Sequence, residues 1–177
     1  VIINLAGASI FRWWTSKAKR MIRDSRILTT RHLVDAMKAS RAEKPAFFSA
    51  SAVGYYGFHG DEELREASAP GSDFLALLAK DWEEEALRAQ IVASRVVITR
   101  FGIVLGRHGG AMAKLMPVFR AFLGGPLGDG RQWMSWIHME DLVEALLFLM
   151  DRPDLVGPVN FTAPYPVRNR DLSLALG

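Results

Sequence analysis

Residues 49–57 carry the side chains best suited to chemistry. They read Ser-Ala-Ser-Ala-Val-Gly-Tyr-Tyr-Gly and follow an apolar run that indicates a short buried strand. A hydroxyl at the end of such a strand can polarise a substrate carbonyl. A nearby tyrosine can donate or accept a proton when a cation stabilises its ionised form. The alternative is a plain turn, shaped by serine and glycine, in which the tyrosines simply pack.

A glycine-rich segment at residues 124–130, followed by Arg131, is the second candidate. Backbone N–H groups of such a loop can cradle a phosphate, and a guanidinium binds phosphate through two hydrogen bonds. The segment lacks the Lys-Ser/Thr ending of a nucleotide-binding P-loop, so an ordinary surface loop is the alternative.

The other polar clusters favour structural roles. His138 has Glu140 and Asp141 nearby, but no second histidine follows at helical spacing and the chain has no cysteine. We therefore predict a hydrogen-bonded structural histidine and no metal site. The remaining charged clusters are interpreted as solvated helix or loop faces: Lys17, Lys19, Arg20 and Arg23, then Glu62, Glu63 and Glu66, then Glu83 to Glu85.

The composition indicates one globular domain. The 177 residues are 50% hydrophobic and 23% charged, with a net charge of +3. No long basic tract and no apolar run near the length of a membrane span is present, so neither nucleic acid nor a membrane is an expected partner. The absence of cysteine is consistent with a cytoplasmic location. The chain has no initiator Met and is expected to be a fragment of something longer.

Strands and helices alternate along the first part of the chain. The expected strands are residues 1–5, 46–50 and 95–100, and the expected helices are residues 17–39 and 74–89. This order is typical of a parallel sheet with crossover helices, in which ligands lie beyond the carboxyl ends of the strands. Further along, we expect helices at residues 111–123 and 140–150, a strand at 157–162, and a last helix starting at Asn169 or Asp171.

These segments together resemble extended short-chain dehydrogenase/reductases, the NAD-dependent epimerase/dehydratase group. The resemblance is closest to the atypical branch labelled sugar-nucleotide epimerases, historically also "cell division inhibitor". The matching segments span nearly the whole chain in the family's order. They are residues 4–7, 25–26 with Thr30, 49–57, 73–76, 82–83, 100–106, 124–128, 136–141 and 160–164.

The resemblance implies an α/β fold: part of an NAD(P)-binding Rossmann domain, a doubly wound parallel sheet, with a small substrate-binding subdomain. Residues 1–5 would be its fourth strand, and the earlier strands and the dinucleotide glycine turn are expected upstream of this chain. Residues 1–110 would form the C-terminal part of the dinucleotide-binding domain. Residues 111–177 would be mainly the substrate-binding subdomain, with a return strand near 157–162. The implied cofactor is NADP, with NAD also possible.

The resemblance also implies roles for individual residues. The cofactor would contact Asn4, Leu5, Ala6, Gly7, Ser49, Ala50, Arg100, Phe101 and Gly102. The substrate would contact Arg131, Gln132 and Trp133, with Arg131 holding an anionic group. Ser51 matches the family's catalytic Ser/Thr.

The family's Tyr-x-x-x-Lys pair, in which lysine activates tyrosine, is incomplete. One register places Ala76 at the tyrosine position and retains Lys80, and another places Phe74 and Leu78 at the two positions. Tyr55 or Tyr56 is our candidate for the missing phenol.

Two functions follow from this comparison. The first is an NAD(P)-dependent oxidoreductase or epimerase that acts by hydride transfer on a small carbonyl or sugar-nucleotide-like substrate. The alternative is a non-catalytic NADP-binding protein, a sensor or structural protein that has lost the Tyr-x-x-x-Lys relay. The expected partners are a dinucleotide and a small molecule, and a homodimer is a possible assembly. A role as an interaction module in cell division has only the historical label behind it.

Overall fold

The structure is a computed structural model that describes residues 1–106 and 109–177, and the chain divides into two compact units. The first unit comprises Val1–Arg100 and Pro153–Asn160, and the second comprises Phe101–Arg152 and Phe161–Gly177. The division falls at Arg100, ahead of the expected boundary at residue 110, and the segment near 157–162 belongs largely to the first unit. The ligand that each unit binds stays a prediction.

The elements follow the expected alternation. The first unit holds β1 (Ile2–Asn4), α1 (Ser16–Ala39), β2 (Ala46–Ala52), η1 (Val53–Tyr56), α2 (Phe74–Leu87), η2 (Arg88–Ile91), β3 (Arg95–Phe101) and β7 (Gly157–Phe161). The last residues of β3 and β7 fall in the second unit. The second unit holds β4 (Ile103–Gly106), α3 (Gly110–Arg120), β5 (Trp133–Met134), β6 (Trp136–His138), α4 (Met139–Met150), β8 (Val167–Arg168) and α5 (Asn169–Leu176).

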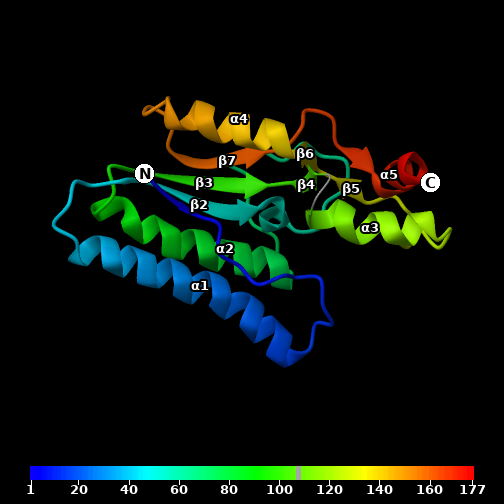
Figure 1. The fold of residues 1–177 in the computed structure, drawn as a ribbon, viewed down its shortest axis with the longest axis horizontal. Coiled ribbons are helices and arrows are strands. Elements are labelled where there is room, and N and C mark those ends of the chain that lie inside the picture. Colours follow the sequence, from blue (N-terminus) through cyan, green and yellow to red (C-terminus); the bar gives the residue numbers. More distant parts are fainter. Residues whose placement is uncertain (107–108) are drawn as a thin grey trace. The chain divides into compact units, whose positions relative to one another are not determined.

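A four-stranded sheet forms the centre of the first unit, in the order β1-β2-β3-β7. Strands β1 and β2 are parallel, with Asn4 opposite Ser49. The arrows of β2, β3 and β7 point the same way in Figure 1. The parallel α/β sheet predicted from the sequence is therefore confirmed. Phe47 and Phe48 in β2, and Val97 and Ile98 in β3, are almost fully buried, as continuous apolar runs in parallel strands require.

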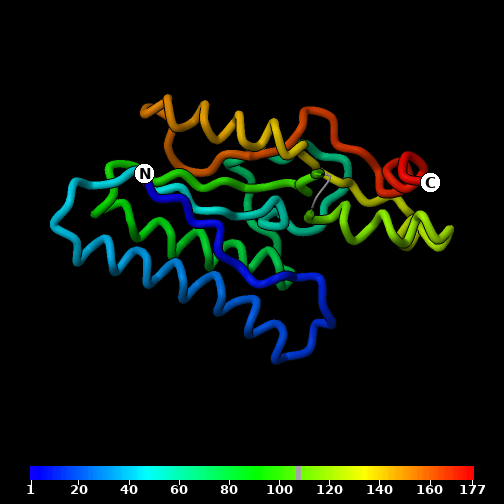
Figure 2. The backbone as a smooth tube through the Cα atoms, in the orientation of Figure 1, coloured from blue at the N-terminus to red at the C-terminus, as the bar shows by residue number. Residues whose placement is uncertain are grey.

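Two helices cover one face of this sheet, and each begins at a side-chain cap. Thr15 caps α1, since its hydroxyl accepts a hydrogen bond from the Ala18 N–H, and Asp73 caps α2 by accepting from Leu75 and Ala76. Figures 1 and 2 show α1 and α2 side by side beneath the strands. The buried core between the layers is made of Val34, Met37, Phe47, Ala86, Ala89, Ala93, Val96 and Ile98.

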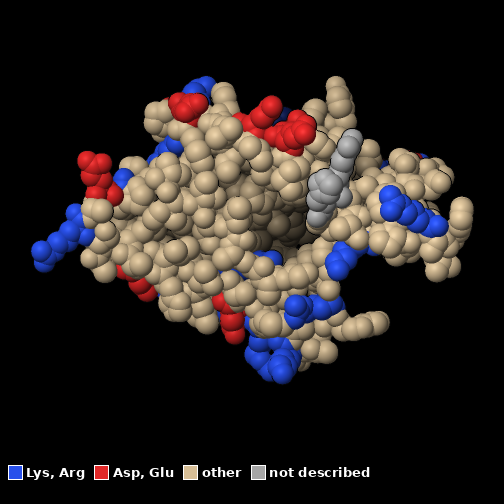
Figure 3. All heavy atoms as spheres, viewed as in Figure 1, with Lys and Arg blue, Asp and Glu red and all other residues tan. Residues whose placement is uncertain are grey.

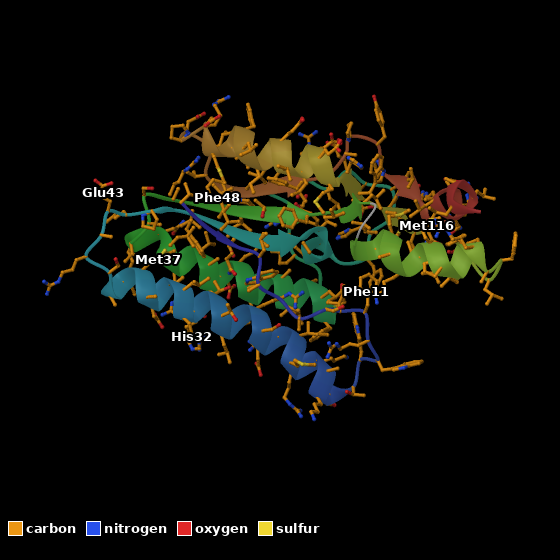
Figure 4. The ribbon with its side chains drawn as sticks, in the orientation of Figure 1. Phe11, His32, Met37, Glu43, Phe48 and Met116 are labelled. Carbon is orange, nitrogen blue, oxygen red and sulfur yellow. The ribbon has the colours of Figure 1, made fainter. Side chains whose placement is uncertain are left out.

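The outer side of α1 is polar. Figure 4 shows His32 on this side, while Met37 and Phe48 lie within the layers. Lys17, Arg20 and Arg23 are exposed. Lys19 is half-buried, with its ammonium 5.1 Å from the Phe74 ring centroid. Lys and Arg side chains gather at the N-terminal end of α1 in Figure 3, so the predicted solvated helix face is confirmed.

The second unit contains two short strand pairs that the sequence pattern did not predict. Strands β4 and β6 are parallel, and β5 and β8 are antiparallel. Helix α3 contacts β4, and α4 contacts both β4 and β6. Strands of two to four residues carry too little alternation to be recognised in a sequence, so these pairs are specified by their partners.

We predict that Ile98→Ala lowers the free energy of unfolding by about 2–5 kcal/mol, because it leaves a cavity in the core between the sheet and its two helices. Ile98 is 1% exposed. The matched control is Ile91→Ala, because Ile91 is 71% exposed, and its effect should stay within about 0.5 kcal/mol. Urea denaturation measures both, and equal effects would contradict the described core.

Candidate functional site

The carboxyl ends of β1 and β2 meet as expected. Asn4 is buried, and its Nδ2 donates to Thr30 Oγ1 at 2.8 Å. Trp82 Nε1 donates to the same oxygen at 2.9 Å. The hydroxyl of one α1 residue therefore ties the end of β1 to α2. Thr30 and Trp82 belong to the segments that resemble the family, but their spacing in the sequence gave them no role.

The segment after β1 is held by α1. Ser25 Oγ accepts from the Ala8 N–H at 2.9 Å, and Arg26 Nη1 donates to the Ala8 carbonyl at 3.1 Å. A Cβ on Gly7 would lie 2.9 Å from the Arg26 guanidinium carbon, so glycine permits this close approach. Burial lowers the pKa of Arg26. Leu5 and Gly7 are exposed and Ala6 is half-buried, so contact of this segment with a cofactor stays a prediction.

A buried ion pair lies at the end of β3. Arg100 Nε and Nη2 donate to the two carboxylate oxygens of Glu83, each at 2.8 Å. The two side chains are 3% and 8% exposed. Burial lowers the Arg100 pKa, but its hydrogen bonds to Glu83 and Tyr56 outweigh burial, so the net pKa is raised and the charge is permanent. The interpretation of Glu83 as part of a solvated face is therefore wrong.

Glu85 was also misassigned to that face. Its side chain is 8% exposed and pairs with Arg31 at 2.8 Å and with Arg88. The hydrogen bond from Arg31 is the largest cause of a lowered Glu85 pKa. Three consecutive glutamates cannot all lie on one helix face, and only Glu84 of this run is exposed.

Tyr56 joins the buried pair to β7. Arg100 Nη1 donates to Tyr56 Oη at 2.9 Å, and Tyr56 Oη donates to Asn160 Oδ1 at 2.6 Å. Arg100 Nη1 also donates to the Glu66 carbonyl at 3.0 Å, and the Glu66 carboxylate accepts from the Asn160 N–H at 2.8 Å. The loop at residues 57–72 is thereby held against the sheet.

The other predicted catalytic residues occupy different surroundings. Ser51 is buried and its hydroxyl donates to Glu83 Oε1 at 2.6 Å. Tyr55 is half-buried, and its ring centroid lies 3.6 Å from the Arg100 guanidinium carbon. Lys80 lies at the surface, 47% exposed and 3.7 Å from Glu84. The structure therefore gathers Ser51, Tyr55 and Tyr56 around Arg100, while Lys80 pairs at the helix surface.

The remaining predicted cofactor residues divide between the units. Ser49 and Ala50 are buried within β2 in the first unit. Phe101 and Gly102 belong to the second unit, where the Phe101 ring lies 5.3 Å from Phe161. A Cβ on Gly102 would lie 2.9 Å from the Ser135 carbonyl oxygen, so glycine is needed for packing there.

The predicted substrate residues Arg131, Gln132 and Trp133 are exposed neighbours in the second unit. The Arg168 guanidinium lies 3.7 Å from the Trp133 ring centroid and donates to the Arg131 carbonyl. Gln132 Nε2 donates to the Leu127 carbonyl at 2.8 Å. Contact of these three residues with a substrate stays a prediction.

The glycine-rich loop uses several of its own N–H groups internally. Leu127 N donates to Asn169 Oδ1 at 2.7 Å, Gly130 N to the Leu127 carbonyl at 3.0 Å, and Arg131 N to Asp129 Oδ1 at 3.0 Å. These bonds favour the surface-loop alternative over a phosphate cradle.

His138 has a structural role. It is the N-cap of α4, with Nδ1 accepting from the Glu140 N–H at 3.4 Å. Among residues 1–106 and 109–177, no group of three His, Cys, Asp or Glu side chains is arranged to hold a metal ion. No helix in the same part of the chain is long and apolar enough to cross a membrane.

We predict that Glu83→Gln lowers the free energy of unfolding by about 3–5 kcal/mol, because it leaves the Arg100 charge buried without a counter-charge. Glu84→Gln is the matched control on the same helix. It removes only an exposed ion pair with Lys80 and should change stability by less than about 1 kcal/mol. Chemical denaturation compares the two, and a neutral Glu83→Gln would show that the pair is not buried in solution.

A second prediction concerns His59, which anchors the loop after η1. Its two ring nitrogens contact Glu62 Oε1 at 2.7 Å and the Tyr56 carbonyl at 2.8 Å. The Glu62 hydrogen bond, followed by the Tyr56 carbonyl, raises the His59 pKa. A histidine whose pKa is raised on folding stabilises the folded state fully at pH values below its unfolded pKa of about 6.5. This stabilisation is lost as the pH rises through the pKa of the folded state.

His59→Ala should therefore cost more stability at about pH 5.5 than at about pH 8, as measured by urea midpoints. In a Glu62→Gln background most of this pH dependence should disappear, because the main partner of the imidazolium is gone. A pH-independent cost of His59→Ala in both backgrounds would rule out the charged contact.

Known proteins resemble nearly the whole chain. A sequence profile described as "NAD dependent epimerase/dehydratase family" matches residues 1–161. The chain is 43% identical over 178 residues to the chloroplastic epimerase family protein SDR39U1 homolog of Arabidopsis thaliana, and 42% identical to an epimerase family protein of Mycobacterium leprae. Both matches cover 99% of this chain, but only 51% of the Arabidopsis relative and 57% of the Mycobacterium relative. The chain thus spans little more than half their length.

Solved structures share the fold. The human epimerase family protein SDR39U1, crystallised with NADPH, superposes with a TM-score of 0.89 at 33% identity, over 99% of this chain and 62% of that one. A nucleoside-diphosphate sugar epimerase of Corynebacterium glutamicum gives 0.82 at 36% identity, over 98% and 36%. None of the relatives named above carries the cell-division label. The Rossmann-type α/β sheet implied by the sequence is confirmed, and the chain belongs to the NAD dependent epimerase/dehydratase family.

Proposed function

We propose that this protein binds NADP(H) and acts by hydride transfer on a small carbonyl or sugar-nucleotide-like substrate. The observation that carries the proposal is the match in fold and sequence to a human relative crystallised with NADPH. The carboxyl ends of β1, β2 and β3 support it, because they bring Asn4, Ser49 and Arg100 to one edge of a parallel sheet, where ligands of such sheets bind.

The residues at this edge fit the nicotinamide end of a dinucleotide. Ala6, Gly7 and Ala50 are small and uncharged, so a planar ring can approach the backbone closely. Asn4 Oδ1 accepts from the Ala6 N–H at 3.2 Å and holds the exposed segment in one conformation. When bound, the cofactor would supply or accept the hydride, and the chain would position it and manage the proton.

The alternative is a non-catalytic NADP-binding protein with a sensing or structural role. Two contacts favour it: the Ser51 hydroxyl hydrogen is directed to Glu83, and that of Tyr56 to Asn160. In the register that retains Lys80, the tyrosine position of the family's relay is held by Ala76, which is fully buried. We place hydride transfer first because Tyr55 keeps a phenol at the same end of the sheet.

Native mass spectrometry of the complete gene product tests the cofactor. We expect one NADPH per chain and weaker retention of NADH. Loss of a deuterium label from the nicotinamide, in the presence of phenanthrenequinone as a generic carbonyl acceptor, then tests hydride transfer.

Each outcome of this experiment selects one reading. Binding together with loss of the label supports the enzyme, and binding with a retained label supports the sensor or structural protein. A complete gene product that retains neither dinucleotide under these conditions would falsify both proposals.

A further inference from the structure

We infer that Tyr55, and not Ser51, Tyr56 or Lys80, is the catalytic acid–base group of this protein. The inference rests on the proposed hydride-transfer function and identifies the residue that handles the proton. It begins from the hydrogen-bond partners of the four candidates, because a group that transfers a proton to a substrate needs a hydrogen that is not already committed to a protein acceptor.

Two of the four candidates, Ser51 and Tyr56, have their hydroxyl hydrogens committed to protein acceptors, and a third, Lys80, lies at the helix surface. Ser51 donates to Glu83 over 2.6 Å, a short bond to a carboxylate that is itself buried. Tyr56 is 3% exposed, donates to Asn160 and accepts from Arg100, so both functions of its hydroxyl are used inside the protein. The Lys80 ammonium lies at the surface beside Glu84.

Tyr55 differs from these residues in its hydroxyl. Its side chain is half-buried, and the hydroxyl has no hydrogen-bond partner within residues 1–106 and 109–177. An uncommitted phenol at the end of β2 is available to a ligand. Apart from Tyr56, no other tyrosine follows this strand, because the chain has three tyrosines and the third, Tyr165, lies in the second unit.

The ring of Tyr55 is held in place although its hydroxyl is free. The Arg100 guanidinium lies 3.6 Å from the ring centroid, and the Tyr56 ring packs edge-on at 5.5 Å. The Tyr55 carbonyl accepts from the Gly71 N–H at 2.9 Å. A Cβ on Gly71 would lie 2.6 Å from the Tyr56 carbonyl oxygen, so this hydrogen-bonded contact requires glycine at position 71. A rigid ring with a free hydroxyl is a preorganised proton donor.

The step that we assign to Tyr55 is balanced. In the reducing direction the substrate carbonyl carbon gains a hydride from NADPH, and the carbonyl oxygen gains the proton of Tyr55 Oη as the C=O double bond becomes a single bond. The substrate is reduced to an alcohol, NADPH is oxidised to NADP⁺, and the phenolate regains a proton from water. The Arg100 guanidinium, 3.6 Å from the ring centroid, holds the ring in place during this step.

The first test reads the position of the hydroxyl without turnover. The complete gene product is labelled with fluorotyrosine, and its fluorine NMR signals are assigned with Tyr55→Phe, Tyr56→Phe and Tyr165→Phe. On addition of NADPH, whose binding is measured separately by calorimetry, we expect the Tyr55 signal to shift and the Tyr165 signal to stay in place.

The second test uses phenanthrenequinone-dependent NADPH oxidation. Tyr55→Phe should lower kcat by about 100-fold or more. NADPH affinity should stay within about 2-fold and the melting temperature should be unchanged, since only a hydroxyl without a protein partner is removed. Tyr56→Phe is the matched control. It should lower the melting temperature, because Arg100 and Asn160 lose a partner, but leave kcat of the folded protein within about 10-fold.

The outcomes separate the two proposals. Failure to bind NADPH overturns the proposed function and this inference with it. Binding without hydride transfer by the unmodified protein overturns the enzymatic reading and the role of Tyr55. Hydride transfer that survives Tyr55→Phe, or an unmoved Tyr55 signal when NADPH is bound, overturns the assignment of Tyr55 alone.

Discussion

The buried pair of Arg100 and Glu83 holds together the candidate-site end of the first unit. Both side chains are almost completely buried and joined by two parallel hydrogen bonds. Removing such charges from water is costly, so the pair adds little net stability compared with an apolar contact of the same size. The pair instead fixes geometry, because the planar guanidinium holds its hydrogen-bond partners in defined positions, whereas apolar packing allows more freedom.

Five segments depend on this pair. Arg100 lies on β3 and Glu83 on α2, Ser51 at the end of β2 donates to the carboxylate, and η1 is engaged through Tyr56. The strand β7 follows through Asn160, which accepts from the same tyrosine. The long loop after η1 therefore has fixed ends, although it has no regular secondary structure of its own. A loop of that length inside a compact unit is expected to serve a site.

The same network distributes the chemical roles. It takes the hydroxyl hydrogens of Ser51 and Tyr56, and this is why we propose that these two residues support the site and do not transfer the proton. It also holds the ring of Tyr55 and leaves its hydroxyl free. In the family relay a lysine follows its tyrosine by one helical turn. In the arrangement proposed here, the cation comes from β3 and contacts the face of the Tyr55 ring.

The sequence alone determined the succession of elements in the first unit. Apolar runs are local signals, and the strands and helices they predicted lie within a few residues of the observed ones. The gathering of polar residues at the carboxyl ends of the strands was also predictable, because parallel strands end on the same side of a sheet.

Only the tertiary structure decided which of those polar residues are buried and which are free. No spacing rule links Ser51 to Glu83, or Tyr56 to Asn160, which are 32 and 104 residues apart. Glutamates 83 to 85 appear alike in the sequence, yet two are buried against arginines and one faces solvent. The physical reason is that the charge state and hydrogen-bond capacity of a residue are local, whereas its desolvation and its partner depend on which distant segments pack against it.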